Sequence, residues 1–373
     1  MSDKKKILMV TGSLQIGGME NVAMNIARYV DKDKFQINFV VYGNKIGEFE
    51  NEVKQLGGEV YHISFPREGA RKYCRALEKI MKDTGPYHVV HSHNLFPSGL
   101  VMKVAHKVQV PVRIAHAHTN RDDSHLNPIR RMYQNYMRKL MWKYATQFFA
   151  CSKKAGNYLF QSKFSENGFV MNNGVCTEKF LVDESTKNEL KKELNISSEK
   201  IIGHTGRFVE VKNHMFLIDI FKSICECEEN VKLLLIGDGP LKKSVEKKVS
   251  DLGLENRVIF TGMRNDVHNL LALMDVYVLP SLYEGVSVSL MEAQAAGVPF
   301  VVSTSAYSEE SKVTDYGTSI DLNSDIQKWR DIIIEQMHRG KLKNATQIVI
   351  DKGYDTSTVV KYVQDKYYNA KEN

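Results

Sequence analysis

The 373-residue sequence is poor in cysteine and has no long apolar run. Its five cysteines are sparse and odd in number for this length, so we expect a reducing compartment and no disulfide framework. The first apolar run, Ile7–Val10, is too short for a secretory signal. No run approaches the roughly 20 residues that a membrane-spanning helix needs. These absences predict a cytoplasmic protein, and any membrane contact that it makes would be peripheral, with the inner face of the cell membrane as the candidate surface.

Several ligand signatures are also missing. The strand-to-helix turns lack the Gly-x-Gly-x-x-Gly fingerprint of dinucleotide-binding proteins and the P-loop, which disfavours a nicotinamide dehydrogenase and an ATP-binding site. Cys225 and Cys227 have no second Cys/His pair nearby, and the HExxH spacing does not occur. Asp31-Lys32-Asp33 spells Asp-x-Asp, but it falls between a helix and the next strand, where we expect a solvated turn. We therefore predict no metal and no cofactor.

Positive charge is concentrated in the N-terminal part of the chain. The first 170 residues hold 26 Lys and Arg against 14 Asp and Glu, whereas the remainder holds 25 against 30. Such a field suits an anionic partner such as a diphosphate, a phospholipid surface or a polyanion. Nucleic-acid binding would rest on charge alone, so no nucleic-acid partner is expected.

Short β-branched or aromatic runs recur along the chain, each followed by turn residues and a helix-period segment. This alternation is typical of βαβ units in a parallel sheet. The first series of expected strands is Lys5–Val10, Gln36–Tyr42, Val60–Ser64, His88–Ser92, Val112–His116 and Gln147–Cys151. The second series, after a connection rich in Lys and Glu, is Ile201–Thr205, Lys232–Ile236, Val258–Phe260, Val276–Leu279 and Phe300–Ser303. The predicted fold class is α/β, with two doubly wound sheets in tandem that bind ligands beyond the carboxyl ends of their strands.

Paired glycines, Gly17 and Gly18, follow the first expected strand and precede an apolar-periodic helix. Because glycine has no Cβ atom, backbone amides there can approach a phosphate at the helix N-terminus. A plain turn would need only one glycine. The pair therefore favours contact with a ligand.

Four histidines lie at the ends of two expected strands. They form His-Ser-His-Asn, with His91 and His93, and Ala-His-Ala-His-Thr, with His116 and His118. The two-residue period of a strand points each pair to one side. We rank contact with substrate hydroxyls first, a buried structural histidine second, and a metal site completed by Asp122 and Asp123 third.

Two cations follow the first strand of the second series, within Gly206–Asn213. The guanidinium fork of Arg207 and the ammonium of Lys212 together match the two phosphates of a nucleotide diphosphate. Solvent-exposed cations are common, however, so this loop alone leaves both interpretations open.

The most specific pattern runs from Glu284 to Glu292, after the strand that ends before Pro280. Two carboxylates with seven residues between them flank a turn of small residues that leads into a helix. Backbone amides near Val288 to Leu290 can cap an anionic phosphate there, and Glu292 can reach ribose hydroxyls. The alternative is a helix cap with a solvated glutamate, but the cations of the preceding loop favour a ligand.

Together these motifs resemble the retaining glycosyltransferases of family four, of the GT-B type, and particularly bacterial capsular and exopolysaccharide enzymes. The resemblance spans nearly the whole chain, and its most specific part is the Glu-x7-Glu element. Supporting pieces are Gly17-Gly18-Met19-Glu20, Arg113 to His118, Cys151-Ser152-Lys153, Asn173-Gly174-Val175, Gly206-Arg207 with Lys212-Asn213-His214, Gly237-Asp238-Gly239-Pro240 and Ala295 to Pro299.

The resemblance implies a domain plan. It consists of a Rossmann-like acceptor-side domain over 1–172, a Rossmann-like nucleotide-sugar domain over 173–354, and a C-terminal segment over 355–373 whose helix returns to the first domain. The two Rossmann-like domains would face each other across a cleft.

It also implies residue roles. Arg207 and Lys212 would hold the donor diphosphate, Glu292 the ribose, and Glu284 the donor sugar or the phosphate loop. His118 would hydrogen-bond the donor sugar beside the acceptor. The other donor contacts would come from Gly17, Gly18, Val288, Ser289, Leu290 and the base-contacting loop Gly262-Met263-Arg264, while His91, His93 and His116 are the acceptor-side candidates.

A basic amphipathic helix is expected over Pro128–Tyr144. Its apolar face is Ile129, Met132, Tyr133, Tyr136, Met137, Leu140 and Tyr144, with Arg131 and Arg138 opposite. Packing on its own domain is preferred over membrane contact. The other hypothesis is that this basic half rests on an anionic inner leaflet and receives a lipid-linked acceptor.

The resulting prediction is a retaining, metal-independent hexosyltransferase. It would move a hexosyl or N-acetylhexosaminyl group from a nucleotide-sugar, expected to be a UDP-sugar, to a saccharide or lipid-linked acceptor in capsule or exopolysaccharide biosynthesis. One alternative is a nucleotide-sugar 2-epimerase of the same fold. The other is a noncatalytic protein that binds sugar nucleotides or polyanions.

Overall fold

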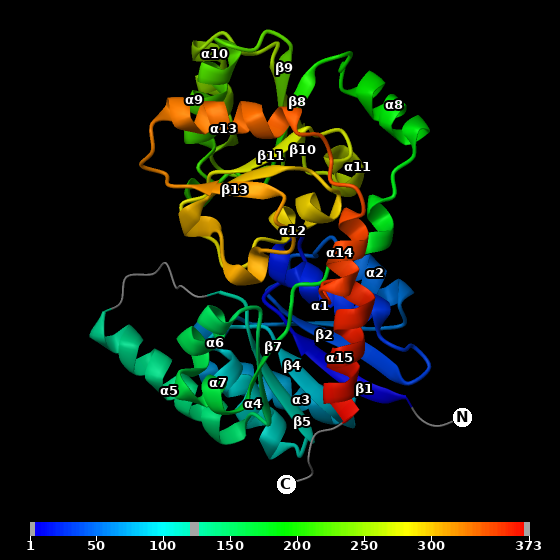
Figure 1. The fold of residues 1–373 in the computed structure, drawn as a ribbon. Coiled ribbons are helices and arrows are strands. Elements are labelled where there is room, and N and C mark those ends of the chain that lie inside the picture. The colour runs from blue at the N-terminus through cyan, green and yellow to red at the C-terminus, as the bar shows by residue number, and fades with distance from the viewer. Residues whose placement is uncertain (1–3, 120–126, 369–373) are drawn as a thin grey trace. The chain divides into compact units, whose positions relative to one another are not determined.

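The computed structural model describes residues 4–119 and 127–368. The chain divides into two compact units. Unit 1 comprises residues 1–174 and 356–373, and unit 2 comprises residues 175–355. Helices cover both faces of the sheet in each unit (Figure 1).

Unit 1 is built on a seven-stranded parallel sheet with the order β3-β2-β1-β4-β5-β6-β7. Its strands are β1 (Lys5–Val10), β2 (Phe35–Tyr42), β3 (Val60–Ile63), β4 (Tyr87–Ser92), β5 (Val112–Ala117), β6 (Gln147–Ala150) and β7 (Gly168–Val170). Its helices are α1 (Gly18–Tyr29), α2 (Glu50–Gln55), η1 (Pro66–Glu68), α3 (Ala70–Asp83), α4 (Ser98–Lys107), α5 (Pro128–Tyr144), α6 (Lys153–Phe160), α7 (Ser162–Asn167) and α15 (Thr356–Tyr368).

Unit 2 is built on a six-stranded parallel sheet with the order β10-β9-β8-β11-β12-β13. Its strands are β8 (Lys200–Thr205), β9 (Val231–Ile236), β10 (Val258–Gly262), β11 (Val276–Leu279), β12 (Phe300–Ser303) and β13 (Gly317–Ile320). Its α-helices are α8 (Glu184–Glu193), α9 (His214–Cys225), α10 (Lys242–Asp251), α11 (Val267–Leu271), α12 (Val288–Ala295), α13 (Ile326–His338) and α14 (Ala345–Asp351). Its 3₁₀ turns are η2 (Thr177–Phe180), η3 (Glu210–Lys212), η4 (Thr304–Ala306) and η5 (Glu309–Ser311).

The apolar strands of unit 2 feed two separate cores because alternate side chains point to opposite faces of a sheet. Leu233 and Leu235 of β9 pack with α9 and α13 on one face. Leu234 and Ile236, the alternate residues, pack with α11 and α12 on the other. Burial on both faces explains why these strands read as unbroken apolar runs.

The two doubly wound sheets that the sequence predicts are confirmed. Two strands are found that it did not predict, β7 and β13, each at an edge of its sheet. They have only three and four residues and begin with Gly168 and Gly317. Strands this short, opening on glycine, carry too little apolar pattern to stand out from a loop.

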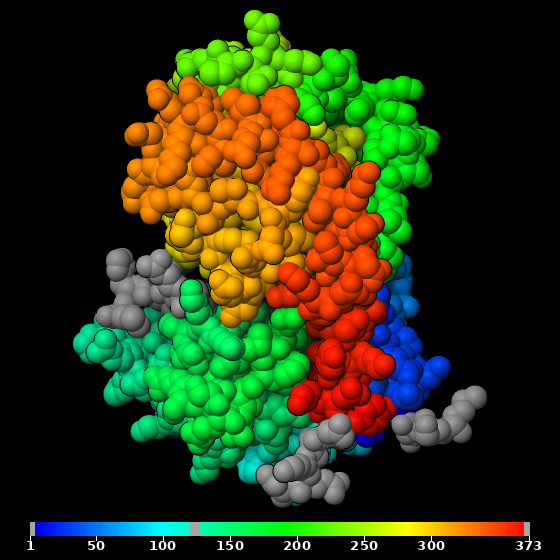
Figure 2. Space-filling view, in the orientation of Figure 1, coloured from blue at the N-terminus to red at the C-terminus, as the bar shows by residue number. Residues whose placement is uncertain are grey.

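The last described helix, α15, packs on unit 1 rather than on the residues that precede it in the chain. Its buried side chains Val359, Val360, Val363 and Tyr367 join the core that α1 and strands β1 and β2 form. Figure 2 shows this helix, in red, lying along the blue and green segments of unit 1. Burying side chains of this size contributes about 1.5–3 kcal/mol each, so α15 is an integral part of unit 1.

The helix α5 differs from its prediction. Met137 and Leu140 are buried as expected, but Ile129, Met132, Tyr133 and Tyr136 are exposed. Arg138, expected on the solvated face, is instead buried. Its guanidinium donates to the carbonyls of Leu159 and Tyr158 at 3.2 and 3.1 Å and lies over the ring of Phe96. The solvated role predicted for Arg138 is therefore wrong, because α6 supplies its partners.

Among the described residues, the helices are all too short or too polar to cross a membrane.

Candidate active site

In unit 2 the chain order reverses between the neighbouring strands β8 and β11. Ligands of doubly wound sheets bind at such a point, beyond the carboxyl ends of the strands. The loop that follows β8 carries Arg207 and Lys212, and the loop that follows β11 carries Glu284. The predicted residues of these two loops therefore gather at the expected edge of the sheet.

An ion pair joins the two loops. The Nζ atom of Lys212 lies 2.6 Å from a carboxylate oxygen of Glu284, and the side chains are 17% and 15% exposed. Two further bonds hold the loops in place: the amide of Leu282 donates to the carbonyl of Val211 at 2.8 Å, and the side-chain amide of Asn213 donates to the carbonyl of Pro280 at 3.2 Å. The ion pair and the two hydrogen bonds between the loops thus hold Lys212 in a defined position.

Arg207 lies on the same loop but is exposed. Within residues 4–119 and 127–368, no hydrogen bond or ion pair engages its side chain. The backbone around it is packed against the turn after β9, since a Cβ atom on Gly239 would lie 2.7 Å from the backbone nitrogen of Phe208. Gly239 also has a φ of +158°, which glycine adopts without strain. The loop is therefore fixed while its guanidinium stays available for an anion.

The start of α12 is organised by hydroxyl groups. Ser287 caps the helix by accepting a hydrogen bond from the amide of Leu290. The hydroxyl of Tyr277 donates to Ser289 at 2.8 Å and also lies 3.3 Å from the carbonyl oxygen of Thr205 at the end of β8. Sequence reasoning missed Tyr277. The available signal was a hydroxyl-bearing aromatic in an otherwise aliphatic strand, Val276–Leu279.

Glu292 lies in the second turn of α12 and is only partly exposed. Burial raises its pKa to about 7, and the charge of Lys179 acts in the opposite direction. Burial also raises the pKa of Tyr277, and the charges of Glu284 and Glu292 raise it further.

The loop predicted to meet the base is arranged differently. Met263 is exposed, and Gly262 has a φ of +70°. The guanidinium of Arg264, however, forms ion pairs with Asp266 at 2.7 Å and with Glu193 at 2.5 Å. The Arg264 side chain thus links the loop to α8. If this loop contacts a base, the contact would come from Gly262 and Met263.

In unit 1 the corresponding reversal point lies between β1 and β4. The helix α1 starts at Gly18, and no side chain among the described residues caps it. Ser13 donates to Glu20 at 2.9 Å, and a Cβ atom on Gly17 would lie 2.5 Å from that carboxylate. A side chain at position 17 would make the Glu20 carboxylate shift, whereas Gly18 faces open space.

The four predicted histidines lie side by side. The Nε2 atom of His91 is 3.1 Å from Nδ1 of His116, and Nδ1 of His93 is 2.8 Å from Nε2 of His118. His91 also bonds to the hydroxyl of Tyr367 at 2.9 Å. Burial lowers the pKa of His91 and of His118 to about 3, and those of His93 and His116 well below the ordinary value.

His91 and His116 are fully buried, and His93 is 2% exposed. This geometry corresponds to the buried structural histidine ranked second from the sequence. Both ring nitrogens of His91 are engaged by protein atoms, so a substrate hydroxyl would have to displace one of them. The predicted contact with acceptor hydroxyls gains no support from this arrangement, while His118 remains partly exposed.

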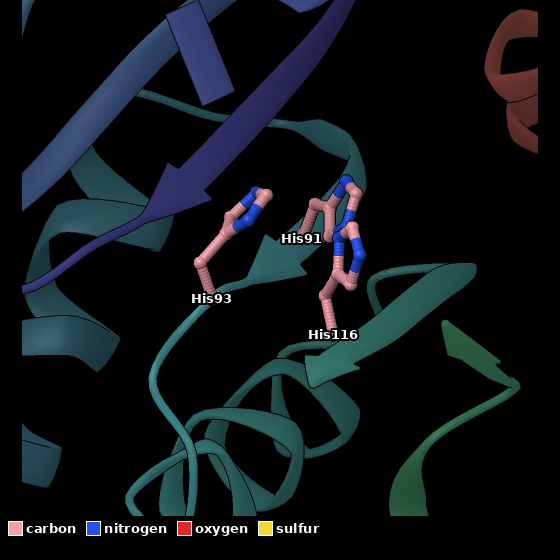
Figure 3. Close-up of side chains that lie close together, drawn as sticks. All are labelled: His91, His93 and His116. Atoms are coloured by element: carbon pink, nitrogen blue, oxygen red, sulfur yellow. The ribbon is translucent and has the colours of Figure 1, made fainter. Parts of the chain in front are cut away.

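One ring nitrogen from each of His91, His93 and His116 lies within 4.8 Å of the others, close enough to surround a metal ion (Figure 3). The ring planes argue against that use. The rings of His91 and His93 are stacked, with centroids 4.3 Å apart and planes 26° apart, whereas ligating nitrogens must aim at one point in their ring planes. Asp122 and Asp123, which were to complete such a site, lie outside the described residues.

Comparisons with known proteins show the family of the chain. Residues 16–179 match the model described as Glycosyltransferase Family 4, and residues 186–348 match Glycosyl transferases group 1. The chain is 32% identical over 360 residues to a Bacillus subtilis protein described as glycosyltransferase EpsF, covering 95% of this chain and 94% of that one.

Two further similarities concern the family and the fold. The UDP-Gal:alpha-D-GlcNAc-diphosphoundecaprenol alpha-1,3-galactosyltransferase of Escherichia coli is 28% identical over 323 residues, covering 80% of this chain and 79% of that one. The crystal structure of HepE from Anabaena, in complex with UDP, superposes with a TM-score of 0.80 at 20% identity, covering 97% of this chain and 99% of that one. The chain therefore has the GT-B fold and belongs to the glycosyltransferases that join a family 4 region to a group 1 region.

Proposed function

We propose that this glycosyltransferase moves a hexosyl or N-acetylhexosaminyl group from a UDP-sugar to a saccharide or lipid-linked saccharide acceptor, with retention of anomeric configuration, during surface polysaccharide biosynthesis. The observation that carries the proposal is the Lys212–Glu284 ion pair at the reversal point of the unit 2 sheet, on the same loop as Arg207, which is exposed and has no side-chain partner among the described residues. A held ammonium and an available guanidinium at that point suit a diphosphate.

The chemistry follows from charge. As the bond between sugar and diphosphate breaks, negative charge grows on the departing nucleotide and the sugar becomes oxocarbenium-like. Lys212, held in advance by Glu284, and Arg207, carried on a fixed loop, stabilise that charge. An ammonium has three donors, so Lys212 can keep its bond to Glu284 while it donates to a phosphate oxygen. His118 would bond a hydroxyl of the transferred sugar.

Glu292 and the start of α12 complete the proposed donor contacts. The carboxylate of Glu292 would accept hydrogen bonds from ribose hydroxyls, and amides near Val288 to Leu290 would face a phosphate. The choice of UDP rests on HepE, solved with UDP, and on the Escherichia coli relative, whose name gives UDP-Gal as donor and an alpha linkage as product.

A transfer assay tests the proposal. Purified chain is incubated with an α-linked UDP-sugar and a GlcNAc-diphosphate-lipid analogue, and the product is examined by NMR. The proposal predicts an α-linked product, formed equally in excess chelator. A β-linked product, or activity lost in chelator and restored by Mn²⁺, would contradict it, and a rearranged nucleotide-sugar released without acceptor would point to an epimerase.

We further propose that α5 contacts an anionic membrane that carries the acceptor. Four apolar or aromatic side chains, Ile129, Met132, Tyr133 and Tyr136, are 40–74% exposed on this helix. A hollow of about 610 Å³ there is lined by Asn127, Pro128, Arg131, Met132, Asn135, Tyr136 and Lys139. Exposed apolar side chains interleaved with cations suit a headgroup layer.

Flotation with vesicles containing anionic phospholipid tests this contact. Arg131→Glu combined with Lys139→Glu should abolish flotation, and salt should weaken it in the unmodified chain. The matched control is Lys243→Glu with Lys247→Glu on α10, which changes the charge equally on exposed residues of unit 2. Equal flotation of both double variants would contradict membrane contact through α5.

A further inference from the structure

His118 has one close polar partner in the histidine cluster, and that partner is His93. The Nδ1 atom of His93 lies 2.8 Å from Nε2 of His118, and the two rings stack with centroids 5.0 Å apart. His118 is partly exposed, whereas His93 is buried. The Nε2 atom of His118 is therefore hydrogen-bonded to His93, and only its Nδ1 atom can bond to a ligand.

Both rings are neutral. Burial lowers the pKa of His118 to about 3 and that of His93 well below its ordinary value. A neutral imidazole carries a proton on one nitrogen and a lone pair on the other. The bond between His93 and His118 therefore has two forms, which differ in which of the two rings donates.

The Nε2 atom of His93, the ring nitrogen that does not contact His118, distinguishes the two forms. Nε2 of His93 is buried and has no hydrogen-bond partner in the described part of the chain. If His118 donated, the proton of His93 would sit on that isolated nitrogen, leaving a buried N–H without an acceptor, which is rare in proteins. If His93 donates from Nδ1, the isolated nitrogen carries only a lone pair. The second form is favoured.

The geometry points to His93 as a positioning residue that fixes the tautomer of His118, so that His118 presents a donor Nδ1–H to the transferred sugar. This inference rests on the proposed contact of His118 with the donor. A ring that could switch tautomers would offer a donor for only part of the time, so fixing the proton favours the productive hydrogen bond.

The other two histidines do not share this role. His91 and His116 bond to each other, and His91 is anchored by Tyr367. Tyr367 is fully buried in α15 and is bonded to His91, not to His118. Removing its hydroxyl therefore disturbs the same cluster without touching the bond between His93 and His118.

The tautomer can be measured without any assay of transfer. In the full chain labelled with ¹⁵N-histidine, long-range ¹H–¹⁵N correlation should show a protonated Nδ1 and an unprotonated Nε2 for His118, with no change from pH 6 to pH 8. The His118→Gln variant assigns the signals. A protonated Nε2 on His118 would overturn the inference, as would Zn²⁺ at stoichiometric concentration shifting the nitrogens of His91, His93 and His116 together.

Kinetics then test the consequence. His93→Gln, whose amide falls near the position of Nε2, should lower kcat about 10- to 100-fold with little change in KM. His93→Asn places an amide donor near the position of Nδ1 and should restore most of that loss. Tyr367→Phe is the control, and a kcat loss equal to that of His93→Gln would contradict the inference. Wild-type chain that shows the expected tautomer but no transfer would instead count against the proposed function alone.

Discussion

At the scale of single residues, Glu292 couples stability to pH. Its pKa of about 7 lies above the ordinary 4.5 because the carboxyl is buried. The native state therefore holds this proton more tightly than the unfolded chain, so stability falls as pH rises from about 4.5 to 7 and stays lower above that.

The variant Glu292→Gln removes this titration. We expect it to be more stable than the unmodified chain at pH 8 and no more stable near pH 5, as measured by urea unfolding at both values. Glu335→Gln, an exposed glutamate of α13, serves as the control and should show no such difference. If the free energy of unfolding differs between Glu292→Gln and the unmodified chain by the same amount at both pH values, the raised pKa of Glu292 is contradicted.

A comparison of Lys212 with Lys232 separates a lysine that binds the donor from one that only forms an ion pair within the protein. Lys212→Met should weaken UDP binding about ten- to hundredfold, because one charge-assisted hydrogen bond contributes about 1.5–3 kcal/mol. Lys232 forms an equally buried pair with Glu199, at 2.8 Å and with 15% and 19% exposure. Lys232→Met should leave affinity unchanged in calorimetric titration with UDP. Equal affinities for the two variants would remove Lys212 from the donor site.

Sequence motifs predicted which cations and carboxylates follow the strand ends, because a loop's place after a strand is a local property. They did not predict the partners of Arg264 and Arg138. Glu193 precedes Arg264 by 71 residues, and Arg138 donates to backbone carbonyls of another helix. Such partners are set by tertiary packing, which leaves no local pattern.

At the scale of elements, α5 combines a fixed inner face with an open outer one. The Arg138 guanidinium donates two hydrogen bonds to carbonyls of α6 and lies over Phe96. Arg138→Ala should lower the free energy of unfolding by about 1.5–3 kcal/mol, measured by urea denaturation. Arg131→Ala, on the exposed face of the same helix, should change it by less than about 0.5 kcal/mol. Similar losses would contradict this division of α5.

The regular elements were the most predictable part of the fold. Strands such as β1 and β9 combine an apolar run with a following turn, and both were expected from these features. The short edge strands β7 and β13 were missed, because pairing with an existing sheet, rather than their own side chains, makes them strands.

At the scale of the whole molecule, the chain builds two doubly wound units and then adds its last described helix to the first of them. Each unit brings predicted site residues to the reversal point of its own sheet. The residues that we propose to bind the donor, Arg207, Lys212, Glu284 and Glu292, all belong to unit 2, whereas His118 and the residue that we infer to orient it belong to unit 1. We therefore expect donor binding to slow amide exchange in unit 2.

Hydrogen–deuterium exchange of the full chain with and without saturating UDP measures this directly. Amides in residues 206–214 and 282–292 should exchange more slowly with UDP bound, because the ligand orders the two loops and the start of α12. Peptides from α5, residues 128–144, should be unaffected. UDP binding that leaves both unit 2 segments unprotected would contradict the proposed donor site.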